Sequence, residues 1–210
     1  MANRIITVGA VGRADLIAES FDSDKPKQVF TSHRGFHTIT GFFQGVPVSV
    51  VAIGIGLSLM DLFVREARAI VDGPMIIVRF GTCGGIGENA RPGTIIVASQ
   101  GAGYITRNPD AFHSASIHEP LPEPYTLHKL VPADQILSDN LVKYLTEAIG
   151  GEHVVTGVNV TADSFYSSQG RIDDRFDDRN EGMIELIRKT YPNAQSLEME
   201  SFTLMHLALR

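Results

Sequence analysis

Short apolar runs that end in glycine alternate along this chain with segments of helical period, and the alternation limits the folds open to it. Ile5 to Val8 and Met75 to Phe80 are such runs, and Leu59 to Val71 between them has apolar residues at helical spacing. Continuous apolar strands separated by helices are typical of α/β proteins whose sheet is covered on both faces. We therefore predict an α/β fold, in a single domain over residues 1–210, with a mixed, largely buried central sheet flanked by helices.

Two segments lack this regular alternation. Tyr104 to Pro132 is rich in proline and histidine and has little periodicity, so we predict an excursion of loops within the same domain. Asp173 to Asn180 is rich in charge, which is typical of a solvated surface segment. Further strands are expected at residues 46–55, 94–98 and 154–161, and further helices at 14–20, 138–149 (with Ser138 as cap) and 182–191.

Charge and cysteine content narrow the class of protein. A formal net charge of −6 and a pI near 5.6 do not favour general binding to nucleic acid, because an acidic surface repels polyanions. The single cysteine, Cys83, cannot form an intrachain disulfide, which favours a reducing compartment. The N-terminus lacks the apolar core of a secretory signal, and no apolar run approaches the roughly 18 residues of a membrane helix. We expect a cytoplasmic protein that binds neither nucleic acid nor membrane.

A glycine-rich turn follows the first predicted strand. Gly9 to Arg13 leads from that strand into a predicted helix, and such a turn lets backbone N–H groups approach an anion. The glycine spacing matches neither a dinucleotide fingerprint nor a Walker loop. Taken alone, the segment is typical of a tight turn that carries a surface arginine.

A second arginine lies inside an apolar strand and changes this interpretation. Arg79 is followed by Gly81 and Thr82, and a buried charge needs an anionic partner or a cavity. Ligands of open α/β sheets bind beyond the carboxyl ends of the strands. Arg79 and Thr82 together therefore indicate an anion site, which we prefer to a structural ion pair of Arg79.

Five motifs in order resemble those of the nucleoside phosphorylase family, which includes uridine phosphorylases and hexameric purine nucleoside phosphorylases. The resemblance runs from Ile5 to about Met205, and each motif gains its specificity from the order of all five. The motifs are Gly9 to Arg13, Ser32 to Arg34, Gly54 to Gly56, Arg79 to Gly85 and Leu197 to Ser201.

The resemblance implies a role for each motif. The residues that hold phosphate would be Gly9, Arg13, Arg79 and Thr82. Arg34 would reach the phosphate in the site of a neighbouring subunit, so the functional unit would be at least a homodimer. The ribose residues would be Glu198, Met199 and Glu200, with Thr82 beside them and Glu200 taking the sugar hydroxyls.

The base is indicated by the segment from Ala162 to Arg171, which resembles the uridine phosphorylase segment that reads uracil through Gln-x-Arg. Gln169 offers an acceptor and a donor that match uracil N3–H and a carbonyl, and Arg171 offers donors to a carbonyl. Phe165 can pack against the base or the sugar. Cys83 and Gly84 would line the wall of the same pocket, without a nucleophilic role for the thiol.

The chain departs from the family pattern at three places. We expect it to lack an N-terminal extension whose histidine covers a neighbour's ribose, and to lack the C-terminal strand, loop and helix. Some bacterial members bind a cation at the dimer interface through a glutamate after the second arginine, where this chain has Gly35. We therefore predict no metal site, and the histidines show no transition-metal spacing.

The reaction implied is the reversible phosphorolysis of uridine to uracil and ribose 1-phosphate, with catalytic roles for Arg79, Gln169, Arg171 and Glu200. Phosphate is a substrate, and no cofactor is expected. A purine nucleoside phosphorylase is one alternative, and a phosphate-independent nucleoside hydrolase is another, against which the three phosphate-type arginines argue. A third is an inactive paralogue that binds nucleoside and regulates a partner subunit.

Overall fold

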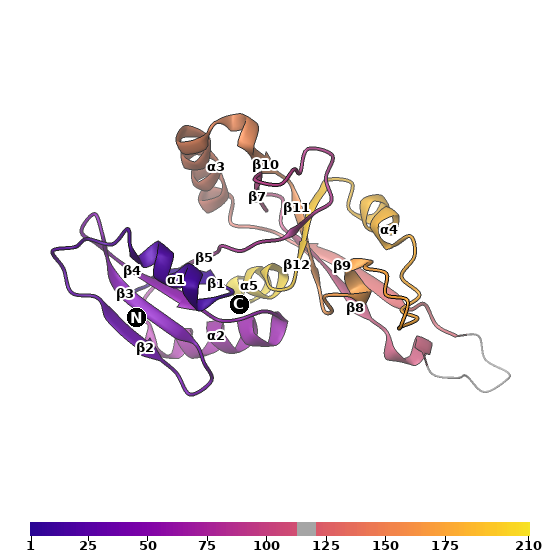
Figure 1. Ribbon diagram of the computed structural model, residues 1–210, viewed down its shortest axis with the longest axis horizontal. Helices are drawn as coiled ribbons and strands as arrows, with labels where there is room; N and C mark the ends of the chain where they lie inside the picture. The colour runs from indigo at the N-terminus through magenta and orange to yellow at the C-terminus, as the bar shows by residue number, and fades with distance from the viewer. Residues whose placement is uncertain (113–120) are drawn as a thin grey trace. The chain divides into compact units, whose positions relative to one another are not determined.

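The computed structural model describes residues 1–112 and 121–210, and it confirms the α/β class with mixed sheets flanked by helices (Figure 1). The strands divide among two five-stranded sheets and one two-stranded sheet. The chain forms two compact units, Met1–Thr82 and Cys83–Arg210.

The first unit is built on a mixed sheet with the strand order β2-β3-β4-β1-β5. β1, β4 and β5 run parallel, whereas β2 and β3 add an antiparallel extension at one side. The hairpin strands were not among the expected elements, because their alternating threonine and aromatic residues lack a continuous apolar run. The five strands are β1 (Arg4–Val8), β2 (Gln28–Thr31), β3 (His37–Phe43), β4 (Val46–Ala52) and β5 (Ile76–Arg79).

Two helices cover this sheet, α1 (Val11–Ala18) and α2 (Leu57–Ile70). The connection from β1 to β4 and the connection from β4 to β5 run in opposite directions along the sheet. Crossovers between parallel strands are right-handed in nearly all proteins, so connections in opposite directions place their helices on opposite faces of a sheet, as Figure 1 shows for α1 and α2. The α1 face buries Val8, Ile39 and Val50 with the alanines of the helix.

The carboxyl ends of the three parallel strands lie at one edge of the sheet. Val8 pairs with Ala52, and Thr7 pairs with Arg79. The turns that follow β1, β4 and β5 therefore leave from the same edge, which is where an open α/β sheet binds its ligands.

The second unit contains the other five-stranded sheet, with the order β6-β12-β11-β8-β9. β8, β11 and β12 run parallel, and β6 and β9 pair antiparallel at the two edges. Its strands are β6 (Gly84–Gly85), β8 (Ala102–Arg107), β9 (Tyr125–Val131), β11 (Val158–Ala162) and β12 (Ala194–Glu198).

Neighbouring residues of β8 show that two helices pack on opposite faces of this sheet, α4 (Met183–Thr190) and α5 (Ser201–Ala208). A Cβ added at Gly103 would lie 2.7 Å from the ring of Tyr191, which follows α4. The next residue, Tyr104, stacks on Phe202 of α5 at 4.9 Å between ring centroids. Successive side chains of a strand point to opposite faces, so α4 and α5 cover different sides.

One expectation about the middle of the chain is wrong. Residues 104–132 were expected to be loops, yet β8 and β9 form an antiparallel pair there, joined in part by a 3-10 helix at Pro109–Phe112. β9 alternates apolar residues with threonine, histidine and lysine, so it has no continuous apolar run. Residues 113–120 of that segment lie outside the described residues.

Two further predictions, the cap of a helix and a continuous strand at residues 154–161, differ from the structure. α3 spans Gln135–Ile149, and its cap is Asp134, which accepts a hydrogen bond from Leu137 N at 2.8 Å, so the predicted Ser138 cap is wrong. The expected strand at 154–161 is divided at Gly157 into two strands that belong to different sheets. The first of them, β10 (Val154–Thr156), pairs with β7 (Ile95–Val97). A short 3-10 helix, Gly151–His153, joins α3 to β10.

Close packing of the first unit can be tested at two glycines. A Cβ at Gly41 would lie 2.4 Å from the ring of Phe21, whereas a Cβ at Gly12 would meet nothing within 4 Å. We expect Gly41→Ala to lower the free energy of unfolding by about 1–3 kcal/mol, since the buried ring must move. Gly12→Ala lies in α1 and should leave stability unchanged or raise it by up to about 1 kcal/mol. Chemical denaturation measures both, and equal effects would contradict this packing.

Candidate functional site

The predicted site residues fall into two groups, one in each compact unit. The phosphate residues lie in the first unit, and the ribose and base residues lie in the second.

Two arginine side chains converge on the glycine turn after β1. A Cβ at Gly9 would lie 3.0 Å from Arg13 Nη2 and 3.5 Å from Arg79 Nη2. A Cβ at Gly81, in the turn after β5, would lie 3.7 Å from Arg79 Nε and 3.8 Å from Arg13 Nη1. The two guanidinium groups therefore share the space left by two glycines at the carboxyl edge of the sheet. This is the arrangement expected of an anion site.

Backbone geometry holds Arg79 at this edge. Its Nη2 donates to Gly54 O at 3.3 Å. Gly54 has a φ of +82°, a backbone conformation that residues other than glycine rarely adopt. The turn after β4 thus orients the arginine at the end of β5. Thr82 lies three residues after Arg79 and is exposed, so its hydroxyl is open to a ligand.

Arg34 takes a different position. It lies in the turn between β2 and β3, where its Nε is 3.6 Å from Glu66 Oε1, and both side chains are more than half exposed. An exposed ion pair of this kind contributes at most about 1 kcal/mol, so an anion can readily replace Glu66. Its action in the site of a neighbouring subunit stays a prediction.

The base residues form a cluster in the second unit. Arg171 Nε donates to Phe165 O at 3.1 Å, and its guanidinium carbon lies 4.3 Å from the centroid of the Phe165 ring. A Cβ at Gly84 would lie 3.9 Å from Arg171 Nη2. Phe165 is 47% exposed, whereas Gln169 is only 5% exposed. The structure thus brings Gly84, Phe165 and Arg171 together, and their contact with a base stays a prediction.

Gln169 and Arg171 are linked to each other. Arg171 Nη2 donates to Gln169 Oε1 at 3.4 Å. A carbonyl oxygen has two lone pairs, so Gln169 Oε1 retains capacity to accept a second hydrogen bond, and the amide nitrogen supplies donors. The pair can therefore present one acceptor and several donors to a planar polar edge.

The Glu198 carboxylate connects β11, β12 and the start of α5. Its Oε1 accepts from Asn159 Nδ2 and Thr161 Oγ1, both at 2.6 Å, and its Oε2 accepts from the backbone N of Glu200 at 2.7 Å and of Ser201 at 2.9 Å. Four donors fill the acceptor positions of a carboxylate. The immediate role of Glu198 is therefore to fix the Met199–Glu200 backbone, and its direct contact with ribose stays a prediction.

Met199 and Glu200 come directly after β12, and the hydrogen bonds of Glu198 hold their backbone. Glu200 is the residue before α5 and is 3% exposed, and Met199 is partly buried. The sequence motif marked these residues, but it gave no sign of the buried asparagine and threonine that hold them.

Cys83 lies beside the same carboxylate. Desolvation, followed by the charge of Glu198, raises the pKa of the Cys83 thiol, while Ser196 opposes the rise. The raised pKa makes the side chain a neutral thiol at neutral pH, and its predicted place in a pocket wall stays a prediction.

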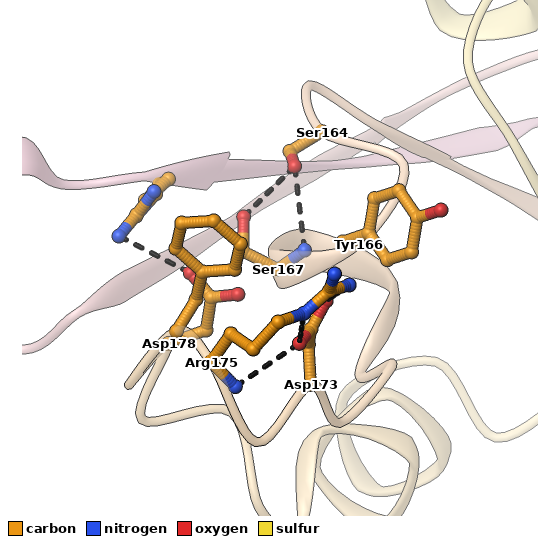
Figure 2. Close-up of a pocket in the computed structure, with 8 residues that line it drawn as sticks. Ser164, Tyr166, Ser167, Asp173, Arg175 and Asp178 are labelled. Carbon is orange, nitrogen blue, oxygen red and sulfur yellow. Dashed lines mark hydrogen bonds and ion pairs between the residues drawn. The ribbon is translucent and has the colours of Figure 1, made fainter.

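The charge-rich segment of residues 173–180 is a loop whose residues are mostly exposed, as predicted, with Asp178 and Asn180 among the exceptions. Asp178 forms an ion pair with Arg107 at 3.2 Å, and Asn180 is 4% exposed. With Ser164, Tyr166 and Ser167 the segment encloses a pocket of about 330 Å³ (Figure 2). Both arginines that line this pocket are paired with aspartates, Arg107 with Asp178 and Arg175 with Asp173.

Metal sites and membrane spans were also sought in the described part of the chain. Within residues 1–112 and 121–210, no group of three histidine, cysteine, aspartate or glutamate side chains could hold a metal ion. No helix in these ranges has the length and apolar character to cross a bilayer.

Comparison with known proteins confirms the resemblance seen in the sequence. The family model described as the phosphorylase superfamily matches residues 3–210. Two relatives are DeoD-type purine nucleoside phosphorylases. The one from Oceanobacillus iheyensis is 29% identical over 210 residues, which are 100% of this chain and 77% of that protein. The one from Exiguobacterium sp. is 26% identical over 166 residues, which are 79% of this chain and 63% of that protein.

Solved structures give the same family. A chain from a study of two uridine phosphorylases of the oomycete Phytophthora capsici has a TM-score of 0.92 and 42% identity, and the match covers 100% of this chain and 75% of that chain. A Trypanosoma brucei nucleoside phosphorylase, reported to show uridine phosphorylase activity, has a TM-score of 0.73 at 21% identity, with 99% and 80% of the chains covered. The second likeness supports the fold alone.

The raised pKa of Cys83 predicts slow alkylation. We expect its reaction with iodoacetamide to rise with pH along a curve shifted above that of an ordinary thiol, because only the thiolate reacts. Glu198→Gln removes the nearby charge and should shift the curve downward. A midpoint at or below that of glutathione would contradict this environment.

The Glu198 network predicts a stability difference between two glutamates. We expect Glu198→Gln to lower the free energy of unfolding by about 1–3 kcal/mol, because an amide nitrogen would face backbone donors. Glu185→Gln is the matched control, since Glu185 is exposed on α4. Urea denaturation of both variants checks the difference, and equal stabilities would refute the structural role of Glu198.

Proposed function

The chain belongs to the phosphorylase superfamily, and from that premise we propose that it is a uridine phosphorylase, converting uridine and inorganic phosphate to uracil and ribose 1-phosphate. The observation that carries this proposal is the cluster of Phe165, Gln169 and Arg171, with its buried glutamine amide and adjoining guanidinium. The Phytophthora capsici structure supports the same substrate at 42% identity.

Uracil fits the polar groups of this cluster. Its N3–H can donate to Gln169 Oε1, its carbonyls can accept from the glutamine amide and from Arg171, and Phe165 offers an exposed ring to the base or sugar. The negative charge that develops on the uracil oxygens as the glycosidic bond breaks is stabilised by these donors. One preorganised donor contributes roughly 3 kcal/mol by analogy with oxyanion holes.

Phosphate binds between Arg13 and Arg79 at the edge of the first sheet, with Gly9 and Thr82 beside it. Each arginine makes charge-assisted hydrogen bonds to phosphate oxygens. The glycosidic bond breaks through an oxocarbenium-like state, and phosphate attacks C1′ on the face opposite the base. Holding both reactants in position supplies much of the rate, and neither a covalent intermediate nor a cofactor is required.

Ribose binds to Met199 and Glu200, where Glu200 accepts from the sugar hydroxyls and Glu198 fixes the backbone. The active unit is at least a homodimer, because Arg34 serves the phosphate site of a neighbouring subunit. The protein is cytoplasmic.

A second candidate is a purine nucleoside phosphorylase. The relatives from Oceanobacillus iheyensis and Exiguobacterium sp., both of that class, favour it. In this alternative Gln169 and Arg171 have no role in reading the base. The choice between the two depends on which nucleoside is cleaved.

A panel of nucleosides tests the base assignment. Release of base from uridine, inosine and adenosine is followed by absorbance with and without inorganic phosphate. We expect uracil release that depends on phosphate, and a loss of kcat/KM for uridine of about 100-fold in Gln169→Ala, because the base loses its amide partner. The KM for phosphate should remain unchanged.

Gln135→Ala is the control for this variant, since Gln135 is exposed at the start of α3. Phosphate-dependent release of hypoxanthine or adenine instead of uracil would establish the purine alternative. The absence of turnover with all three nucleosides would contradict a nucleoside phosphorylase of either kind.

A further inference from the structure

The segment that carries Gln169 and Arg171 is a tight turn held mainly by its own backbone. Arg171 N donates to Tyr166 O at 3.0 Å, and Gly170 N donates to Ser167 O at 3.2 Å. Gly170 has a φ of +67°, and a Cβ there would lie 3.0 Å from Met183 Cβ. The turn is therefore compact, yet these backbone hydrogen bonds all lie within the turn itself.

Asn180 supplies a connection from outside the turn. Its Nδ2 donates to Ser167 O at 2.9 Å and to Arg171 O at 3.1 Å. The two acceptors lie at the beginning and the end of the stretch that contains Gln169. One side-chain amide thus uses both of its hydrogens to hold the two ends of this stretch together.

Asn180 is itself fixed. The side chain is 4% exposed, so a change that removes its amide would leave Ser167 O with Gly170 N as its donor and would take from Arg171 O the donor that Asn180 supplies. Two residues before it, Asp178 forms the ion pair with Arg107, and its backbone O accepts from the hydroxyl of Tyr125 at 2.6 Å. Asn180 O accepts from Met183 N, at the start of α4. Contacts to β8, β9 and α4 therefore anchor the asparagine against the sheet.

We infer that Asn180 is a positioning residue for recognition of the base. It transmits the rigidity of the sheet to the turn that presents Gln169 and Arg171, and it touches neither base nor phosphate. The inference rests on the proposed function, because it assigns a role within the same base site. A displacement of about 1 Å at a reacting group can cost about 100-fold in rate, so a loosened turn should reduce catalysis strongly.

The test uses Asn180→Asp in the intact chain. The carboxylate has the size of the amide but cannot donate to Ser167 O or Arg171 O, and it repels both oxygens. We expect the KM for uridine to rise about 10-fold or more, with the KM for phosphate unchanged. KM does not depend on the fraction of active protein, so a loss of folded enzyme alone would not produce this split.

Two further variants make the result decisive. Asn193→Asp is the matched control, because Asn193 is exposed and makes its side-chain hydrogen bond to Gln100. Asn180→Ser keeps one donor, so it should lie between the wild type and Asn180→Asp, and it replaces that variant should it fail to fold. In the Gln169→Ala background, a change at Asn180 should lower kcat/KM for uridine less than it does in the wild type, because one of the two side chains that it positions is absent.

An unchanged KM for uridine in a folded Asn180 variant, even with a lowered melting temperature, would overturn the inference. Effects of Asn180 and Gln169 that multiply as independent changes would also overturn it. A wild-type chain without phosphate-dependent turnover of uridine would instead contradict the proposed function, so the two failures are distinguishable.

Discussion

Parallel strands end at a common edge, and this constraint determines where the chain can build a site. In the first unit, Gly9 and Arg13 follow β1, and Arg79 ends β5, which pairs with β1 in parallel. In the second unit, Gln169 lies beyond the end of β11, and Glu198 ends β12, its parallel neighbour. Side chains that are far apart in sequence therefore become neighbours within each unit, because the parallel pairing of the strands brings their carboxyl ends together.

The two groups differ in the physical basis of their recognition. Arg13 and Arg79 meet around glycines, so the first group offers concentrated positive charge in a small space. The second group offers a neutral amide beside a guanidinium and an aromatic ring, with the backbone next to it fixed by a fully hydrogen-bonded carboxylate. Charge suits an inorganic anion, and directional donors and acceptors suit a planar base. Phosphorolysis requires one reactant of each kind.

Sequence reasoning predicted the parts that depend on local patterns. The continuous apolar strands and amphipathic helices were recognisable, and an arginine inside an apolar strand drew attention to the edge where the structure brings Arg13 and Arg79 together. The chemistry of Gln169 and Arg171 was also readable, because the family motif places them two residues apart.

The parts that were missed depend on tertiary partners. The antiparallel pairing of β8 with β9 was missed, because polar residues interrupt the apolar residues of β9 and make its sequence resemble that of a loop. Asp178 and Asn180 lie in a charge-rich stretch that is typical of an exposed loop. Their low exposure is explained only by the ion pair of Asp178 with Arg107 and by the hydrogen bonds of Asn180 to Ser167 and Arg171. The sequence also gave no sign that Asn159 and Thr161 donate hydrogen bonds to the Glu198 carboxylate, because these partners lie on other parts of the chain.

The most direct test of the account is the fate of phosphate during cleavage of uridine. Phosphorus NMR of the chain with uridine and inorganic phosphate follows the loss of free phosphate and the appearance of ribose 1-phosphate. We expect one phosphate to be consumed for each uracil released. Release of uracil with free ribose and unchanged phosphate would show hydrolysis, and it would contradict the role assigned to Arg13 and Arg79.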